Sequence, residues 1–184
     1  MTNLIDHGQV HYWGTSMWPP HLVERTISIA KENGYIAPSV EEPPYHMMAR
    51  FIEVDLIPVA KYHGLGLTTF EALATGLFTG KYMNDTPIGS RNDTFQKFPE
   101  EVTERYARIL PGLKDLADSI GIGMNHLAIA WTLRLPEISS SIMGARLPEQ
   151  VRSNVEATDV ILSNETLERI EEILANKPRI FYSQ

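Results

Sequence analysis

The chain has 184 residues, 43% of them apolar and 21% charged, so it can bury the core of one globular domain. Its formal net charge of −7 argues against a nucleic-acid partner, and the lack of cysteine excludes disulfides, thiolate catalysis and cysteine metal sites. No apolar run approaches the about 18 residues of a membrane span, and the N-terminus lacks the features of a signal peptide, so we expect a cytoplasmic protein without membrane insertion.

Four short segments rich in strand-forming residues each precede a longer segment with the apolar period of a helix. The predicted strands are residues 11–16, 36–45, 64–73 and 139–145. Strands that alternate with helices predict a parallel sheet with helices packed against it. Such a sheet has two free edges, which are a liability in an isolated chain. We therefore expect one domain over residues 1–184, with strands that need partners.

The first half of the chain predicts two helices and a loop. One helix begins at Pro20 and ends at Gly34, because proline favours the first helical position and glycine ends helices. Apolar residues at a mostly helical spacing predict the second helix over residues 47–63. Residues 83–98 are polar, turn-rich and without periodicity, which is typical of a functional lid or of a disordered segment.

The second half predicts further helices from their boundary residues. Apolar residues at helical spacing from 102 to 120 predict a long helix, which Pro111 is expected to kink or divide. Asn125 is predicted to cap the next helix. Pro148 suits the first position of a helix that runs through Ala157. Ser163 is predicted to cap the last helix.

The junction between the fourth strand and its helix is the first candidate binding site. Gly144 ends the strand, Arg146 follows, and a helix begins immediately afterwards. Unpaired backbone N–H groups at a helix start, the positive end of the helix dipole and a guanidinium form a natural phosphate pocket. Gln150 and Asn154 lie four residues apart and share one helix face. The alternative is a solvated arginine beside two surface amides.

The segment after the third strand is the second candidate site. Phe70 ends the strand, and Gly76 belongs to a pair of glycines that lets the backbone approach a ligand closely. Lys81 supplies a point charge suited to a phosphate, and Arg91 in the following loop is placed to close over the same anion. The alternative is a turn followed by a surface lysine.

Other residue types give no catalytic constellation. The six histidines show no metal-ligand spacing, and no nucleophile elbow of the form G-x-S-x-G occurs. Glu41 and Glu42 are adjacent, so on a strand they point to opposite faces and do not form an acid–base pair. The three tryptophans are expected in the core rather than in a stacking site: Trp13, Trp18 and Trp131.

Several motifs in order resemble the aldo-keto reductases, and the voltage-gated potassium channel β subunits are the most similar branch. The resemblance covers residues from about 8 to 178 and rests on residues 12–18, 73–82 and 127–131, on Gly144 and Ala145 with Glu149, Gln150 and Asn154, and on 176–178. The family is a (β/α)8 barrel that binds NADP(H) and reduces aldehydes and ketones. The resemblance therefore implies the C-terminal half of a TIM barrel, strands five to eight.

The resemblance also implies a role for each matching residue. Ser16 would hold the nicotinamide carboxamide, and Phe70 would take the aromatic position near the cofactor. The loop over residues 83–98 would lie on the cofactor side of the domain. The remaining residues would contact the phosphates and the adenosine 2′-phosphate end: Leu73, Ala74 and Gly76 at the pyrophosphate, Lys81 and Arg91 at or over phosphate, and Gly144, Arg146, Gln150 and Asn154 at the 2′-phosphate.

Several positions depart from the family pattern. Glu71 and Ala72 stand where the family has Ser-Pro, and a carboxylate near a pyrophosphate repels it by a few kcal/mol at about 4 Å near a surface. Glu42 replaces the glutamine that binds the carboxamide, and Met17 replaces a common asparagine. Arg146, in place of a frequent serine, adds positive charge near the 2′-phosphate. We expect weak NADP(H) binding.

The family's catalytic Asp, Tyr, Lys and His (or Asn) have no match in this sequence. The chain alone is therefore expected to hold cofactor without reducing carbonyls, because the tyrosine acts as the general acid. Such a chain would meet a small carbonyl substrate only if an N-terminal half completed it, so we expect a homo-oligomer or a partner chain. The alternative is a regulatory or scaffolding subunit resembling the potassium channel β subunits.

Overall fold

The computed structural model describes residues 1–94 and 97–178, and within them it shows one four-stranded parallel sheet. The strands are β1 (Gly14–Ser16), β2 (Val40–Glu42), β3 (Gly66–Phe70) and β4 (Ile138–Ile142), and they lie side by side in chain order. Parallel neighbours require a crossover connection, which the intervening helices supply. The predicted α/β fold with four parallel strands is confirmed.

Each strand is shorter than the sequence predicted. The second strand ends at Glu42 because Pro43 and Pro44 follow it, and proline has no N–H to continue a ladder. The third begins at Gly66 because Gly64 takes the left-handed conformation (φ 69°) that ends the preceding helix. Local chemistry at the strand ends therefore trims all four strands to between three and five residues.

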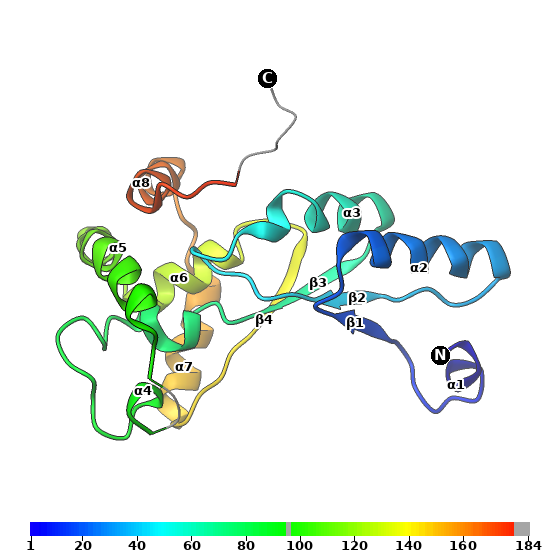
Figure 1. Cartoon of the computed structure of the whole chain (residues 1–184), viewed down its shortest axis with the longest axis horizontal. Coiled ribbons are helices and arrows are strands. Elements are labelled where there is room, and N and C mark those ends of the chain that lie inside the picture. Colours follow the sequence, from blue (N-terminus) through cyan, green and yellow to red (C-terminus); the bar gives the residue numbers. More distant parts are fainter. Residues whose placement is uncertain (95–96, 179–184) are drawn as a thin grey trace.

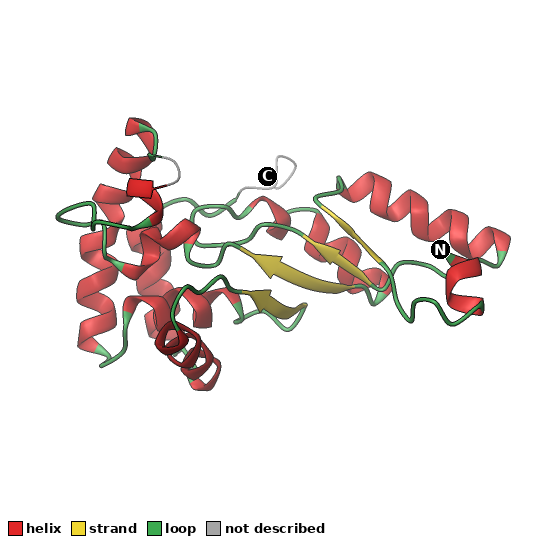
Figure 2. Ribbon diagram, turned by 90° about the horizontal axis from the view of Figure 1, so that it is seen from below, coloured by secondary structure: helices red, strands yellow, loops and turns green. Residues whose placement is uncertain are grey.

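Two helices cover one face of the sheet, helices α4 to α8 gather beyond one end of it, and α1 lies near the N-terminus at the other end (Figure 1). Helices α2 (Pro20–Asn33) and α3 (Leu56–His63) lie on the same side of the strands, and Figure 2 shows the strands from the other side with no helix in front of them. The remaining helices are α1 (Thr2–Asp6), α4 (Arg91–Thr94), α5 (Glu100–Ser119), α6 (Met124–Thr132), α7 (Pro148–Glu156) and α8 (Asn164–Leu174), with 3-10 turns η1 (Phe51–Glu53), η2 (Ala74–Thr79) and η3 (Ala157–Asp159).

Four helix ends follow the sequence prediction. Pro20 occupies the start of α2, and Gly34 ends this helix with a left-handed φ of 68°. Pro148 begins α7. The side chain of Ser163 accepts a hydrogen bond from the backbone N–H of Thr166 at 3.1 Å, so it caps α8.

Three helix predictions and the predicted burial of the tryptophans need correction. The helix predicted over 47–63 is reduced to η1 and α3, because its first residues form a turn instead, in which the Ala49 N–H donates to the His46 carbonyl and the Met48 N–H donates to the His46 ring. Helix α5 is not divided at Pro111, since buried residues before and after the proline hold it as one element, so of the predicted kink or division only the division is excluded. Asn125 lies inside α6, whose N-cap is Gly123. Trp18 is 41% exposed, and only Trp131 of the three tryptophans is fully buried.

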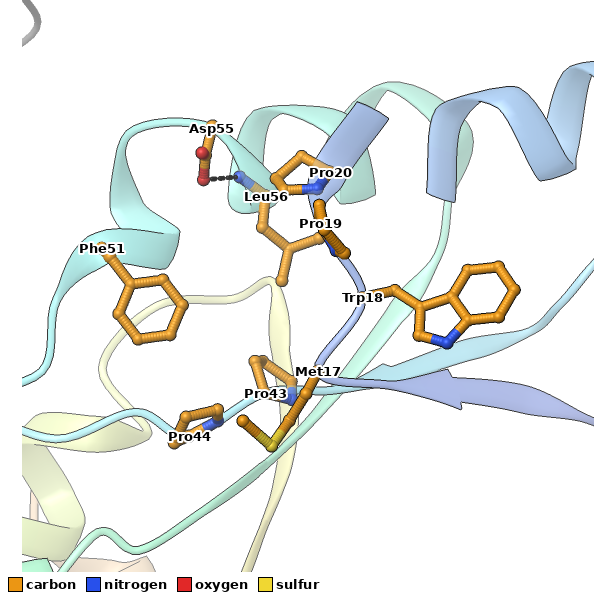
Figure 3. Close-up of a pocket in the computed structure, with 9 residues that line it drawn as sticks. All are labelled: Met17, Trp18, Pro19, Pro20, Pro43, Pro44, Phe51, Asp55 and Leu56. Atoms are coloured by element: carbon orange, nitrogen blue, oxygen red, sulfur yellow. Dashed lines mark hydrogen bonds between the residues drawn. The ribbon is translucent and has the colours of Figure 1, made fainter. Parts of the chain in front are cut away.

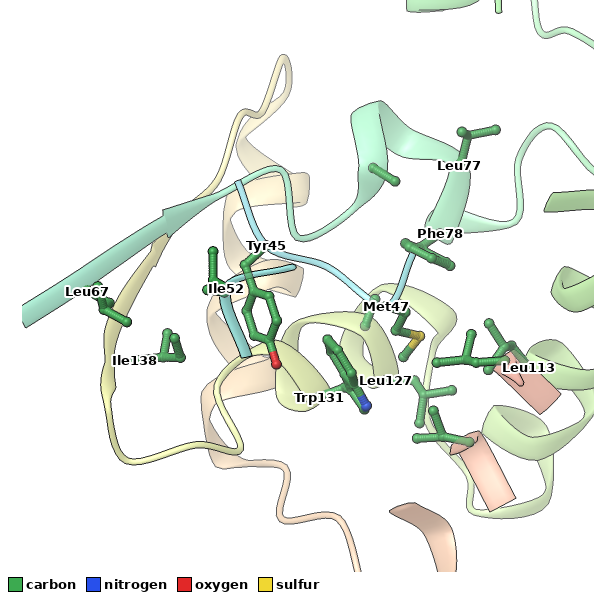
Figure 4. Packing of buried hydrophobic residues seen from close by; sticks show 14 of the residues in the cluster. Tyr45, Met47, Ile52, Leu67, Leu77, Phe78, Leu113, Leu127, Trp131 and Ile138 are labelled. Carbon is green, nitrogen blue, oxygen red and sulfur yellow. The ribbon is translucent and has the colours of Figure 1, made fainter. Parts of the chain in front are cut away.

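The core lies between the sheet end and the distal helices (Figure 4). Trp131 of α6 is buried against the ring of Tyr45, with centroids 5.2 Å apart, and the guanidinium of Arg134 stacks 3.7 Å above its indole. Around them, Glu53 accepts hydrogen bonds from Arg50, Arg134 and Tyr45. This half-buried polar cluster ties η1 to Arg134, just after the end of α6.

Candidate functional site

The carboxyl ends of the strands bring two predicted site residues to one edge of the sheet. Ser16 ends β1 and Phe70 ends β3, and the strand β2 between them ends at Glu42. The Ser16 hydroxyl donates to the Glu42 carbonyl at 3.1 Å, and the Phe70 N–H donates to Pro43. Ligands of parallel α/β proteins bind at this edge.

The adjacent carboxylates of β2 point to opposite faces, as predicted. Glu41 is fully buried on the face that α2 and α3 cover, whereas Glu42 is half-buried on the uncovered face beside Ser16. The two groups therefore cannot act together as an acid–base pair. Glu42 is the carboxylate that an approaching ligand would meet first.

The turn after β3 brings Gly76 and Lys81 together. Ala74, Thr75 and Gly76 have φ values of 45°, 56° and 102°, so the backbone coils in a left-handed sense. The φ of 102° at Gly76 favours glycine, and a side-chain carbon there would lie 3.2 Å from the Nζ of Lys81, so the lysine end would have to shift slightly to make room for one. Leu73, just before, packs half-buried against the core.

The start of α7 differs from its predicted form. The Gln150 side-chain oxygen accepts from the backbone N–H groups of Arg146 at 2.8 Å and of Leu147 at 3.3 Å. These N–H groups were expected to be unpaired, so this part of the phosphate pocket was predicted wrongly. The glutamine three residues after the N-cap makes the second half of a capping box, whereas Leu147 at the N-cap has no side-chain acceptor to make the first half.

The other residues of this junction remain accessible to different degrees. A side-chain carbon on Gly144 would meet no atom within 4 Å, so the space beside it is open. Asn154 is half-buried, and its side-chain oxygen accepts from Asn125 of α6 at 3.4 Å. Gln150 and Asn154 thus serve protein contacts on α7 as well as sharing a face.

The guanidinium of Arg146 joins the two candidate sites. Its Nη1 donates to the carbonyl of Gly89 in the loop over residues 83–98. Gly89 in turn donates its N–H to the Asp93 carboxylate at 2.7 Å. The loop contains α4, which begins at Arg91, but the side chain of Arg91 lies outside the described part of the structure. Arg146 and this loop therefore form one continuous surface, although 57 residues separate Arg146 from Gly89.

An apolar pocket of about 210 Å³ adjoins the ends of β1 and β2 (Figure 3). This pocket was not predicted from the sequence, although two proline pairs flank it and indicate rigid walls. The lining residues come from the β1 turn, the segment after β2 and the start of α3: Met17, Trp18, Pro19, Pro20, Pro43, Pro44, Phe51, Asp55 and Leu56. Asp55 uses one carboxylate oxygen to accept the Leu56 N–H at 2.6 Å.

The described residues include neither a metal-binding cluster nor a membrane-spanning helix. No three or more His, Asp or Glu side chains lie together in a way that could hold a metal ion. No helix in the same part of the chain is both long and apolar enough to cross a membrane.

The fold and this edge define a parallel α/β protein, with its candidate site at the carboxyl ends of the strands. The family model described as "Aldo/keto reductase family" matches residues 1–175. The chain belongs to the aldo/keto reductase family.

Three relatives are potassium channel subunits by their names. The "Probable voltage-gated potassium channel subunit beta" of Arabidopsis thaliana is 34% identical and that of Oryza sativa subsp. japonica 36% identical, each over 97% of this chain and 57% of the relative. The "Putative voltage-gated potassium channel subunit beta" of Schizosaccharomyces pombe (strain 972 / ATCC 24843) is 36% identical over 96% of this chain and 54% of its own length. The chain spans little more than half the length of these relatives.

Proposed function

We propose that the chain carries the NADP(H)-binding half of an aldo-keto reductase barrel, strands five to eight. The observation that supports this most is the joint surface of Arg146, Gly144 and the loop at Gly89, which lies after the carboxyl end of β4. A guanidinium beside open space and a helix start suits a phosphate group. Lys81 on the Gly76 turn offers a second positive charge after β3.

The same residues explain why we propose weak binding. Arg146 must exchange the Gly89 carbonyl for a phosphate, and the Gln150 side chain already occupies two backbone donors. Glu71, exposed at the start of the turn that leads to Lys81, would repel a pyrophosphate. Glu42 beside Ser16 offers no side-chain N–H to a carboxamide oxygen.

We also propose that the chain alone does not reduce carbonyls. The family's catalytic tetrad has no match among its residues, and a bound cofactor would supply only the hydride. Ser16 would orient the carboxamide, and Phe70 would flank the ring. Reduction of a small aldehyde or ketone would then need a chain that brings the general acid.

A fluorescence titration with NADPH tests this proposal on the whole chain. We expect saturable weak binding, and no NADPH oxidation with a reactive aldehyde. Arg146→Ala should weaken binding about tenfold or more, since a charge-assisted hydrogen bond contributes about 1.5–3 kcal/mol. Arg152→Ala, at an exposed arginine on α7, the helix that follows Arg146, is the matched control and should leave binding unchanged. Absence of NADPH binding, or equal affinity in both variants, would overturn the proposal.

The names of the relatives favour a second candidate, a regulatory or scaffolding chain that works through oligomer contacts. In that role, association with a potassium channel subunit matters more than turnover. Capture of the full chain by the cytoplasmic domain of a voltage-gated potassium channel, with no dependence on NADPH, would support this candidate. Failure of that capture at micromolar concentration would count against it.

A further inference from the structure

Glu41 is a carboxylate without an ionic partner in the core of the described chain. It is fully buried in β2, on the face covered by α2 and α3, and none of the salt bridges found within residues 1–94 and 97–178 includes it. Burying a charged group is costly unless hydrogen bonds compensate it. Both of its oxygens are in fact engaged, and both bonds reach the same short segment.

The two bonds hold the ends of the turn that follows β1. One Glu41 oxygen accepts from the hydroxyl of Thr15, and the other accepts from the backbone N–H of Trp18 at 2.9 Å. Thr15 and Trp18 flank Ser16 and Met17. The carboxylate therefore clamps residues 15–18 from beneath, across from the face on which the Ser16 hydroxyl lies.

The clamped turn contains a strained residue. Met17 has a φ of 58°, in the left-handed region that non-glycine residues adopt at an energetic cost. Such a conformation persists only when its surroundings determine it. The Met17 N–H donates to the Glu42 carbonyl at 3.1 Å, the same carbonyl that receives the Ser16 hydroxyl. Four hydrogen bonds thus fasten the turn to the two glutamates of β2.

We infer that Glu41 is a positioning residue: its buried carboxylate sets the turn over residues 15–18 and thereby places the Ser16 hydroxyl at the carboxyl edge of the sheet. The inference rests on the proposed function in so far as Ser16 contacts the nicotinamide carboxamide. It also reaches beyond that site, because the same turn presents Met17 and Trp18 to the apolar pocket. Glu41 itself touches neither the edge nor the pocket.

Substitutions at Glu41 separate this role from simple core packing. Glu41→Leu keeps the approximate size but removes both acceptors. Glu41→Gln keeps one acceptor for the Trp18 N–H, and its amide can donate to the Thr15 hydroxyl, which also accepts. If the carboxylate positions the turn, glutamine should restore what leucine loses. If it only fills volume, both variants should behave alike.

The test measures two properties of each full-length variant. Hydrogen exchange of the Trp18 amide, followed by NMR, reports the turn directly, and NADPH titration reports the edge. In Glu41→Leu we expect Trp18 exchange about tenfold faster and NADPH affinity about tenfold lower, the equivalent of one lost charge-assisted hydrogen bond. Glu41→Gln should stay within about threefold of the parent in both. Glu42→Gln is the control for exchange, since only its backbone carbonyl contacts the turn.

The outcomes distinguish the two proposals. Unchanged Trp18 exchange in Glu41→Leu, or equal losses in the leucine and glutamine variants, would overturn the inference. A parent chain that does not bind NADPH would overturn the proposed function, and Trp18 exchange alone would then decide whether Glu41 sets the turn. If Glu41→Leu does not fold, Thr15→Val replaces it, with Thr15→Ser as its control, because only valine removes the donor to Glu41.

Discussion

At the scale of single residues, His46 is a histidine that the fold keeps neutral. It is 9% exposed, its ring meets Phe78 edge to face, and its Nδ1 accepts the Met48 N–H at 3.2 Å. Burial, helped by the positive charge of Arg105, lowers the pKa of His46 to about 4. A proton on Nδ1 would break the bond to Met48, so the geometry agrees with this direction.

We predict an acid loss of stability that originates at His46. The unfolded chain binds a proton below about pH 6.5, whereas the folded chain refuses it until about pH 4. The contribution is complete above pH 6.5, and it falls by about 1.4 kcal/mol per pH unit as the pH drops through that window. Urea unfolding at several pH values measures it.

His46→Asn is the matched variant for this prediction. The asparagine oxygen can accept the Met48 N–H in place of Nδ1 and does not titrate. The slope of the unfolding free energy between pH 6.5 and pH 4 should therefore be smaller in this variant than in the parent. Equal slopes would show that His46 is not the source.

At the scale of elements, Arg50 connects η1 to the C-terminal helix. It is 5% exposed and donates to Glu53 at 2.9 Å, to Glu171 of α8 at 2.7 Å and to Asn176 at 3.3 Å. Burial opposes the ionisation of Glu53, yet hydrogen bonds from Arg50 and Tyr45 outweigh it and hold the pKa of Glu53 below its ordinary value. The Arg50 guanidinium therefore pairs with two carboxylates, that of Glu53 in η1 and that of Glu171 in α8.

Arg50→Ala should destabilise the chain by about 1.5–3 kcal/mol, because it removes charge-assisted hydrogen bonds to Glu53 and Glu171, of which only Glu53 keeps Arg134 and Tyr45 as partners. Chemical denaturation measures this loss, and the same variant should increase proteolysis after α8. Arg169→Ala is the control: its 2.6 Å pair with Glu172 is exposed on α8, so its removal should change stability by less than about 1 kcal/mol. Similar losses in both variants would contradict a special role for Arg50.

These elements also show what the sequence could predict. Proline, glycine and serine at helix ends act locally, so the boundaries at Pro20, Gly34 and Ser163 were predictable. The irregular chain after β2 was not, because its hydrogen bond to Phe70 and the Arg50 contacts with α8 join residues far apart in sequence. Each of these partners is unremarkable in its own segment.

In the candidate site, too, the features set by local sequence were predictable and those set by distant contacts were not. That Ser16 and Phe70 share an edge follows from parallel strands alone, and the structure has it so. The Gln150 side chain fills the backbone donors at the start of α7, which the sequence did not predict because Leu147 at the N-cap does not complete the capping-box pattern. The bond from Arg146 to Gly89 depends on how a loop folds, which no local pattern encodes.

At the scale of the whole molecule, the sheet has one uncovered face and two free edges. β1 and β4 are its outer strands, and all strands run in the same direction. Residue pairing places Ser16, Glu42, Thr68 and Ser140 on the uncovered face. A two-fold axis would set β1 of one copy beside β4 of another, which would pair both edges and enclose that face.

We therefore predict that the chain associates at micromolar concentration, and that Thr68→Lys prevents it. The lysine would be solvated on the open sheet of a monomer but buried within a closed pair of sheets, where an unpaired charge is costly. Light scattering after size exclusion, across a range of concentrations, measures the mass. Ile161→Lys adds the same charge at a side chain that is 94% exposed, and it should associate like the parent. A parent that stays monomeric, or a Thr68→Lys variant that assembles equally well, would rule out closure through the open face.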